Sequence, residues 1–366
     1  MNNSVWPYEE LTIQVTTEGR CVFATPWFSR QIQLLPEFRE EFMQFFERPS
    51  DYPVTSQVQY WSQLFGESLG DPLFYILPRA TSLNAQTDVH VVKDGSARLR
   101  ELQNQFVKNE TNLSDDIKKN LLLRDWDAEA LLGLSQIPGT EQYDPISLFS
   151  AMRRFYYLDA LHFDQTIAMY EEVREFKKTS DEKFRKAMAV VSRQNYEVTH
   201  RCQEVLAPAL ELAQSARAAL TEFMQAEKGH DNLLRRGLQE LDANVIHQPA
   251  LPVTTHLLDV FKTNAQSNFL AFALTVSLFE ETSPDGGTDP LTRTLLENGE
   301  EKAAEAFLRH GQINDEGGHE NMGVVFLQNM APIDKAYALE AIEMGEAVSK
   351  VINVYTTQIR DEIRRK

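Results

Sequence analysis

Residues 213–241 read AQSARAALTEFMQAEKGHDNLLRRGLQEL, and this stretch predicts a long helix with one buried face. Its apolar residues recur at steps of three and four, at Ala213, Ala216, Leu220, Phe223, Leu234, Leu238 and Leu241. The two positions in the middle of the same face are Glu227 and His230. A buried carboxylate and a buried imidazole are costly unless they are paired or bind a metal ion. Because residues three apart point the same way on a helix, these two side chains are expected to be metal ligands inside a helical protein.

From about residue 146 onward the sequence predicts almost only helix. Long amphipathic segments alternate with proline-bearing and glycine-bearing connections, which end helices. The expected helices cover residues 146–178, 181–206, 209–242, 255–281, 291–316 and 333–364. Six or more helices of this length favour an all-α bundle, which we assign to a domain spanning residues 146–366.

Residues 1–125 differ from the rest and are expected to form a smaller, mixed α/β N-terminal extension. Apolar residues that alternate over 11–15 and a second apolar run over 21–23 predict a β-hairpin. The segment EFREEFMQFFERP, which follows Pro36, predicts an amphipathic helix. The role of this extension stays open between an extra packing layer, a peptide-recognition module, a dimerisation element and a lid.

Composition excludes several classes of protein. The 366 residues are 42% hydrophobic and 25% charged, which is typical of a soluble globular protein. The net charge of −18 disfavours binding to nucleic acid or to an anionic membrane. The two cysteines, Cys21 and Cys202, make neither a disulfide framework nor a cysteine-ligated zinc site. Neither a membrane-spanning run nor a signal peptide is recognisable, so we expect a cytoplasmic protein.

A second carboxylate is expected to face the interior at the end of the helix predicted over 255–281. The apolar face formed by Phe269, Phe272 and Val276 continues at Glu280. Glu281 is turned away from that face by about 100°. Glu280 is therefore the expected inward residue, although a solvated acidic helix end is the alternative interpretation.

The segment AEAFLRHGQINDEGGHENMG, residues 304–323, brings further candidate ligands. His310 shares a helix face with Phe307, and Asp315 and His319 stand four residues apart. On a straight helix nine residues turn about 900°, which places His319 opposite His310. Both can face one centre only if the helix is bulged or broken, and Gly317–Gly318 is the expected place for a break.

Taken singly, each of these histidines is more often a core residue than a metal ligand. Together, the acids and histidines of three helices favour a metal site. Mixed Asp, Glu and His ligation without cysteine suits iron or manganese better than structural zinc, and the choice between those two stays open. Bridging carboxylates with anchoring histidines are typical of di-iron sites in helical bundles.

The motifs resemble those of the haem-oxygenase-like di-iron oxidases and oxygenases, a family of iron-containing redox enzymes. AEKGHDNLLRRGLQEL (226–241) resembles the E-x-x-H helix of the family, and SLFEETSP (277–284) resembles its second-glutamate helix. FLRHGQINDEGGHE (307–320) resembles its third motif, and SRQNYEVTH (192–200) resembles the helix before the first motif. The resemblance covers residues 146–366 and depends on the order and spacing of the motifs.

The resemblance implies a haem-oxygenase-like bundle of about seven helices that binds no haem. It implies two irons per chain, as Fe(II) or Fe(III), with O2 as co-substrate. The implied iron ligands are Glu227, His230, Glu280, His310, Asp315 and His319. The third motif of the family usually spaces His, Asp and His by four and then three, whereas here Asn314 stands at +4 from His310. Asp315, Asn314 and Glu316 therefore stay open as the residue that completes this motif.

The resemblance also implies an O2-activating oxidase or oxygenase, and we favour N-oxygenation of a small amine, amino acid or related metabolite in natural-product biosynthesis. Oxidative C–C cleavage or decarboxylation of an amino acid or fatty acid at the same site is the alternative. A helical binding or scaffold protein without catalysis is the alternative from another class, with Glu227 and His230 as a buried hydrogen-bonded pair. A thiaminase-like hydrolase with Cys202 as nucleophile is a weaker option.

The expected partners are O2 and a small-molecule substrate, without nucleic acid and without a membrane. An external electron donor and a homodimer stay open. Beyond the metal ligands, no catalytic residue and no other cofactor-binding residue is expected. Tyr196 and His200, on the helix that precedes the first motif, either face the site or pack in the core.

Overall fold

The computed structural model describes two compact units, Met1–Asp88 with Ser283–Gly287, and Val89–Thr282 with Thr288–Lys366. The residues that it describes are 3–7, 12–15, 20–24, 29–33, 74–78, 92–110, 112–122, 124–137, 139–158, 161–280, 289–317, 319 and 322–365. All the candidate metal ligands belong to the second unit.

The described part of the first unit consists of strands. Strand β1 (Asn3–Pro7) pairs antiparallel with β5 (Phe74–Pro78). Strands β2 (Thr12–Val15), β3 (Arg20–Ala24) and β4 (Ser29–Gln33) form an antiparallel sheet in that order. The β2–β3 pair lies on the segment in which the sequence predicts a hairpin. The helix predicted after Pro36 lies outside the described residues.

The second unit is all-α, as the sequence predicts, apart from two isolated β-bridges of Tyr143 with Gln136 and Ile333. Its α-helices are α3 (Gly95–Asn109), α4 (Asp115–Leu122), α5 (Ala128–Ser135), α6 (Pro145–Leu158), α7 (Leu161–Thr179), α8 (Asp181–Leu206), α9 (Arg217–Ala226), α10 (His230–Leu241), α11 (Pro252–Ser267), α12 (Phe269–Glu280), α13 (Pro290–Glu297), α14 (Glu301–Gly317), α15 (Met322–Leu327) and α16 (Lys335–Arg365). Short 3₁₀ helices are η3 (Ala207–Glu211), η4 (Gln214–Ala216) and η5 (Val245–His247).

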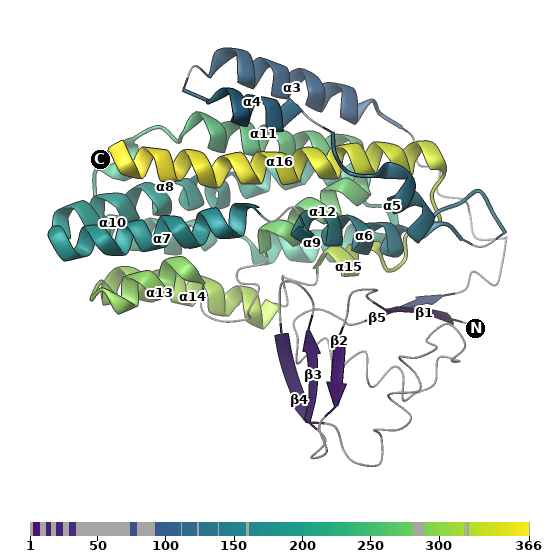
Figure 1. Cartoon of the computed structure of the whole chain (residues 1–366), viewed down its shortest axis with the longest axis horizontal. Coiled ribbons are helices and arrows are strands. Elements are labelled where there is room, and N and C mark those ends of the chain that lie inside the picture. Colours follow the sequence, from purple (N-terminus) through teal and green to yellow (C-terminus); the bar gives the residue numbers. More distant parts are fainter. Residues whose placement is uncertain are drawn as a thin grey trace. The chain divides into compact units, whose positions relative to one another are not determined.

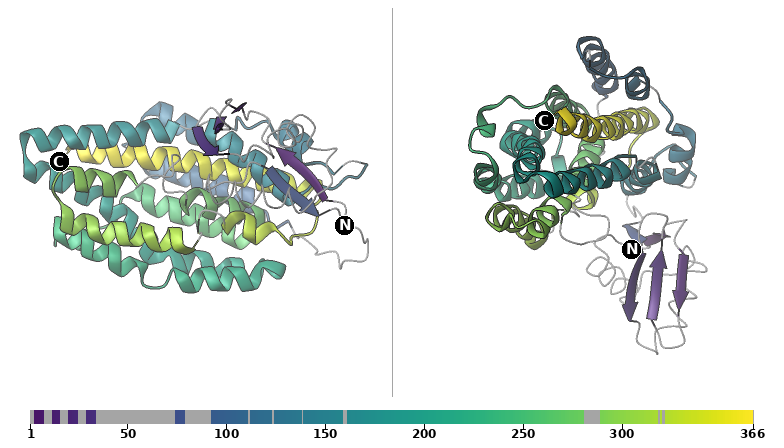
Figure 2. Two further views of the ribbon diagram at one scale, coloured as in Figure 1. Left: turned by 90° about the horizontal axis from the view of Figure 1, so that it is seen from below. Right: turned by 60° about the vertical axis from the view of Figure 1, so that its left-hand side comes forward.

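Helix α16 runs through the unit and organises it. Its 31 residues span about 46 Å, and it packs against α3, α7, α11 and α12. Figures 1 and 2 show α7, α8, α10 and α16 running along a common direction, with α3 and α4 beside α11 and α16. Because α3 and α4 pack on α16, the helical unit begins near Val89, earlier than the domain start expected at residue 146.

Helix α12 lies in the centre of the core. All of its residues from Phe269 to Leu278 are buried, so it is apolar on every side rather than along one stripe. Its buried Thr275 is matched, because Asn264 Nδ2 of α11 donates a hydrogen bond to Thr275 Oγ1 (2.9 Å). This buried helix carries Glu280 at its last position.

Three of the helices predicted as continuous are split. The predicted helix over 209–242 contains α9 and α10, that over 255–281 is α11 and α12, and that over 291–316 is α13 and α14. The predicted helix over 146–178 covers α6 and α7, and the two residues between them, 159–160, lie outside the described residues. At one break Asn268 is extended, and its Oδ1 accepts a hydrogen bond from Ala271 N (3.1 Å), which caps α12. The predictions of continuous helices were wrong because a short break can preserve the buried face, and periodicity records only that face.

Helices α10 and α14 approach closely at Gly237. A Cβ atom at this position would lie 2.6 Å from Cε2 of Phe307 and 3.0 Å from the carbonyl oxygen of Ala303. The absence of a side chain at Gly237 therefore allows α10 and α14 to approach closely. Helix α10 carries His230 and α14 carries His310, so this approach also brings the two histidines near each other.

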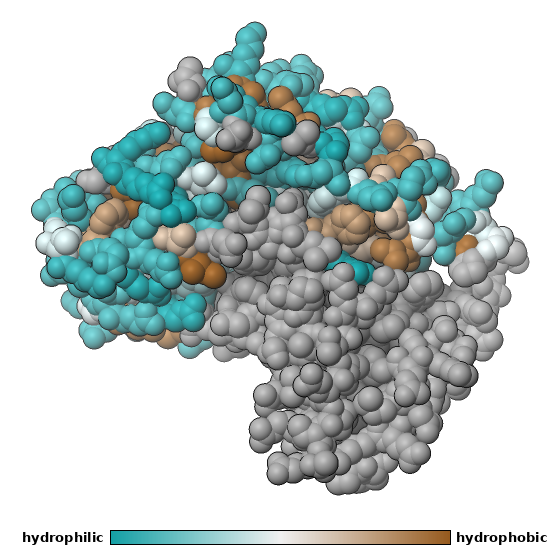
Figure 3. All heavy atoms as spheres, in the orientation of Figure 1, coloured by the Kyte–Doolittle hydropathy of each residue, from teal (hydrophilic) through white to brown (hydrophobic). Residues whose placement is uncertain are grey.

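The described surface in Figure 3 is mostly hydrophilic, with scattered apolar residues. The large exposed apolar side chains are Val92, Leu122, Ile167 and Leu296. None of the described helices combines the length and the apolarity that crossing a membrane requires.

Candidate metal centre

Glu227 and His230 lie on either side of a tight turn, and not within one straight helix. Helix α9 ends at Ala226, and the N–H of Glu227 donates to the carbonyl of Phe223 (3.0 Å). Gly229 has a φ of 89°, which a residue with a Cβ rarely adopts, and α10 begins at His230. The turn still keeps the two side chains together, because Glu227 Oε2 lies 3.3 Å from His230 Nδ1. Both side chains are buried.

Glu280 comes from a different part of the chain. It is the last residue of α12, and its Oε2 lies 3.5 Å from His319 Nδ1. The structure thus places Glu280 at the site. Glu281 lies outside the described residues.

His319 reaches the same place because α14 ends at Gly317. The end of the helix falls where the sequence predicts a break. His319 therefore does not continue the helix of His310, and the two side chains need not point in opposite directions. His319 Nδ1 lies 3.0 Å from Glu227 Oε1. The ring of His319 packs edge-on against Phe223, with centroids 5.0 Å apart, and only 3% of the His319 side chain is exposed.

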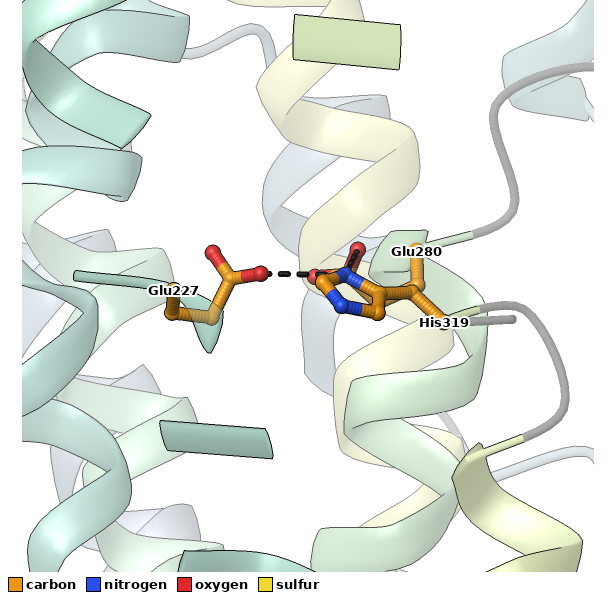
Figure 4. A group of neighbouring side chains, drawn as sticks. All are labelled: Glu227, Glu280 and His319. Atoms are coloured by element: carbon orange, nitrogen blue, oxygen red, sulfur yellow. Dashed lines mark ion pairs between the residues drawn. The ribbon is translucent and has the colours of Figure 1, made fainter. Parts of the chain in front are cut away.

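Glu227, Glu280 and His319 form one group of potential ligands. One donor atom from each lies within 4.8 Å of the other two. Figure 4 shows the three side chains pointing toward one another from three separate segments of the chain. These segments are the α9–α10 turn, the end of α12 and the connection between α14 and α15.

The other expected ligands do not join this group in the described part of the chain. His230 stands beside it, through its contact with Glu227. His310 stands one layer further out, with its ring edge-on to His230 and centroids 5.1 Å apart. The backbone of Asp315 belongs to α14, and its side chain, like that of Glu316, lies outside the described residues.

Asn314 also belongs to the site. Its Nδ2 donates a hydrogen bond to Glu280 Oε2 (3.0 Å), and only 6% of the residue is exposed. The signal for this residue is its spacing, because it follows His310 by one helical turn on the same face of α14. From the sequence, Asn314 is expected only as a replacement for Asp315, whereas in the structure it is the hydrogen-bond partner of Glu280.

The electrostatics of the group are those of two carboxylates around a cationic ring. Burial raises the pKa of Glu227, but the adjacent His230 and His319 rings outweigh burial and lower it to about 2. Burial lowers the pKa of His319, but Glu227 and Glu280 outweigh it and raise it to about 9. Burial raises the pKa of Glu280, and the negative charge of Glu227 adds to that effect. A proton on His319 therefore supplies the positive charge that this site requires.

His310 differs from His319 in its electrostatics. Burial, helped by the nearby His230 ring, lowers the pKa of His310 to about 4. The ring is therefore neutral at physiological pH. A neutral imidazole is the form that binds metal ions.

Three potential metal-binding atoms of the site are buried and have no hydrogen-bond partner in the part of the chain that the structure describes. They are Glu227 Oε1, His230 Nδ1 and His319 Nδ1. Each atom lies 3.0–3.3 Å from the other member of a Glu–His pair, and a cation bound among them would satisfy all three. Ligands with bonds of about 2.1 Å lie about 3.0 Å apart at neighbouring corners of an octahedron. The separations of 3.0 and 3.5 Å around His319 are close to this value, so the residues fit a bound metal ion.

Tyr196 and His200 do not point into the group. His200 is 52% exposed, and its Nδ1 lies 2.9 Å from Asp231 Oδ2. Its ring stacks on Tyr196 with centroids 5.3 Å apart. The two residues therefore form a stacked pair at the surface of α8, with Tyr196 as the buried member.

Cys202 is half-buried and carries an unreactive thiol. Burial, with a further contribution from the Glu227 carboxylate, raises the pKa of this thiol to about 12. Since the thiolate is the nucleophile, this environment argues against a cysteine-dependent hydrolase.

No protein-family model matches this chain, and neither a curated protein nor a solved structure matches it. The interpretation of the site therefore depends on the geometry of its own side chains and on the motifs that carry them.

Proposed function

We propose that this chain is a non-haem iron oxidoreductase that activates O2. The observation that carries the proposal is the convergence of Glu227, Glu280 and His319, whose ligand atoms lie within 4.8 Å of one another, with Glu227 and His319 buried and Glu280 partly buried. Two carboxylates and an imidazole without a thiolate favour iron or manganese. The order of the three motifs, and their resemblance to the haem-oxygenase-like di-iron family, supports iron and a bundle of that type.

In this proposal the protein side chains hold and orient the metal. Glu227, Glu280 and His319 are its ligands, and His230 orients Glu227 through the 3.3 Å contact between Nδ1 and Oε2. When bound, iron supplies the binding and reduction of O2, which amino-acid side chains do not provide. Burial of Glu227 and His319 lowers the local dielectric constant and strengthens their attraction for the cation. The resemblance predicts two irons per chain, and the described ligand group accounts for one.

The proposed reaction is N-oxygenation of a small amine, amino acid or related metabolite in natural-product biosynthesis, with an external electron donor and a homodimer left open. This choice depends on the resemblance. Oxidative C–C cleavage or decarboxylation would use the same ligands. Products formed from candidate amines, amino acids and fatty acids in the presence of O2 separate these outcomes.

The test is an anaerobic titration of the full chain with Fe(II), followed by exposure to O2 and stopped-flow absorbance. We expect at least one tightly bound iron per chain and an absorbance change that requires O2. Glu227→Gln should abolish both, because it removes one ligand charge at nearly constant size. The matched control is Glu222→Gln on the exposed side of α9, which should bind iron as the wild type does.

The competing interpretation is a scaffold protein in which Glu227 and His319 form a buried ion pair. The 3.0 Å separation of Glu227 Oε1 and His319 Nδ1 also suits that interpretation. It predicts that Glu227→Gln lowers the free energy of unfolding without changing metal content. A wild-type chain that is folded and binds no Fe(II) would establish the scaffold reading and end the proposal.

A further inference from the structure

Two divalent cations in a helical bundle require more negative charge than one. The carboxylate centres of ferritin-like bundles use four glutamates and two histidines for two ions, which balances four positive charges with four negative ones. Among the side chains that the structure describes, the ligand group contains two carboxylates, Glu227 and Glu280. These two charges balance one divalent ion.

Asn314 occupies the place at which a further carboxylate would stand beside Glu280. Its Nδ2 lies 3.0 Å from Glu280 Oε2 and donates a hydrogen bond to it. The amide is neutral, and its N–H hydrogens present positive partial charge on that side of the carboxylate. An aspartate of nearly the same size would bring a negative charge to the same buried position.

The two outer histidines offer little to a second ion. His230 and His310 stand edge-on to each other, and the carboxylate that contacts His230 is Glu227, which already belongs to the first group. A second ion here would bring two positive charges. Among the described side chains, its one carboxylate ligand would be Glu227, which it would share with the first ion. Its binding would therefore be much weaker than that of the first ion.

From these contacts we infer that Asn314 is a positioning residue that restricts the centre to one tightly bound metal ion. It holds Glu280 as a ligand of that ion, and as a neutral amide it adds no negative charge for a second ion. The inference deepens the proposed function and depends on it, because it concerns the same site.

The test uses the full chain with Mn(II) alone, added without oxygen. Equilibrium dialysis gives the number of bound ions, and electron paramagnetic resonance shows whether they are coupled. We expect one bound Mn(II) per chain with the six-line spectrum of an isolated ion. Two tightly bound, magnetically coupled ions in the wild type would overturn the inference while leaving the proposed function intact. Absence of binding would overturn both.

Variants of Asn314 separate charge from packing. Asn314→Asp supplies one of the two further negative charges and should strengthen the binding of a second Mn(II), whereas the exposed control Asn232→Asp on α10 should not. Asn314→Leu keeps the size but not the hydrogen bond, and it should weaken the single ion by about 10- to 100-fold. An Asn314→Leu chain with wild-type affinity would contradict the positioning role.

The variant Asp315→Asn tests whether the Asp315 carboxylate binds a second ion. If that carboxylate served a second ion, the wild type would bind two ions and Asp315→Asn would bind one. We expect one ion in both chains. Because the wild-type stoichiometry is measured directly, the result stands even if one of the substituted chains fails to fold.

Discussion

His319 Nδ1 lies 3.0 Å from Glu227 Oε1, and neither atom makes a hydrogen bond within the described part of the chain. The contact joins the α9–α10 turn to the connection after α14, two segments far apart in the sequence. A short approach of two buried polar atoms that lack hydrogen-bond geometry is expected where a cation completes the site. The first two predictions below follow from this contact, and the other two concern helix packing at Gly237 and the buried Glu346.

A bound metal ion should stabilise the fold. A ligand at 100 times its dissociation constant adds about 2.7 kcal/mol to the free energy of unfolding. For a domain of this size that corresponds to a rise in Tm of about 5 °C. Thermal unfolding followed by circular dichroism, with and without Mn(II), measures the change. Glu280→Gln should lose this rise, and an equal rise in that variant would place the ion elsewhere.

The affinity for the metal should increase with pH up to about 9. The pKa of His319 is raised to about 9 by Glu227 and Glu280 despite burial, so the free site carries a proton on this ring at neutral pH. The ion must displace that proton, and each pH unit below the pKa weakens binding by about tenfold. Dissociation constants for Mn(II) at about pH 7 and about pH 8.5 give the slope. An affinity that does not change with pH would mean that His319 is not a ligand.

Gly237→Ala should destabilise the helical unit. The new Cβ would lie 2.6 Å from the Phe307 ring and 3.0 Å from a backbone oxygen of α14, which cannot move easily. Overpacking of this kind costs about 1–3 kcal/mol. The matched control is Gly133→Ala in α5, where a Cβ meets nothing within 4 Å and removal of glycine from a helix should stabilise. Urea unfolding measures the free energy of unfolding of both variants. Equal changes in the two variants would refute the close approach of α10 and α14.

Stability should fall as the pH rises from about 4.5 to about 7 because of Glu346. This buried residue accepts hydrogen bonds at Oε1 from the N–H groups of Asp125 (2.6 Å) and Trp126 (3.2 Å). Burial, with the neighbouring Asp125 carboxyl, raises the pKa of Glu346 from 4.5 to about 7. The folded state therefore binds this proton more tightly than the unfolded state, and the stabilisation is lost as the proton leaves.

Glu346→Gln tests this pH dependence, because it keeps the acceptor oxygen and removes the titration. Urea unfolding between about pH 4.5 and pH 7.5 should show a flatter profile for this variant than for the wild type. The exposed Glu343→Gln, one turn earlier on α16, is the control and should keep the wild-type profile. A wild-type slope in Glu346→Gln would assign the effect to other groups.

Periodicity predicted the buried faces well. Phe223, Leu234 and Leu238 are buried as the stripe requires, and the all-α class of the second unit is confirmed. The inward position of Glu280 followed from the same reasoning. Periodicity did not predict the turn at Gly229 or the extended Asn268, because each break restores the same buried face within a few residues.

The candidate site was only partly predictable. Glu227 and His230 are only three residues apart, so the sequence keeps them close, although a turn at Gly229 joins them in place of the predicted helix. The contact of His319 with Glu227 and the hydrogen bond from Asn314 to Glu280 join separate helices. Their distances depend on how those helices pack, which no local pattern encodes.

The sequence by itself therefore determined a helical protein with acids and histidines on buried helix faces, because spacing along one chain segment sets which side chains share a face. The tertiary structure alone decided which of those side chains meet. It brought Glu227, Glu280 and His319 together, left His230 and His310 beside them, and set Asn314 against Glu280. The physical reason is that the ends of α9, α12 and α14 are positioned by packing between helices, where separations of a few ångströms decide whether two side chains can share one ion.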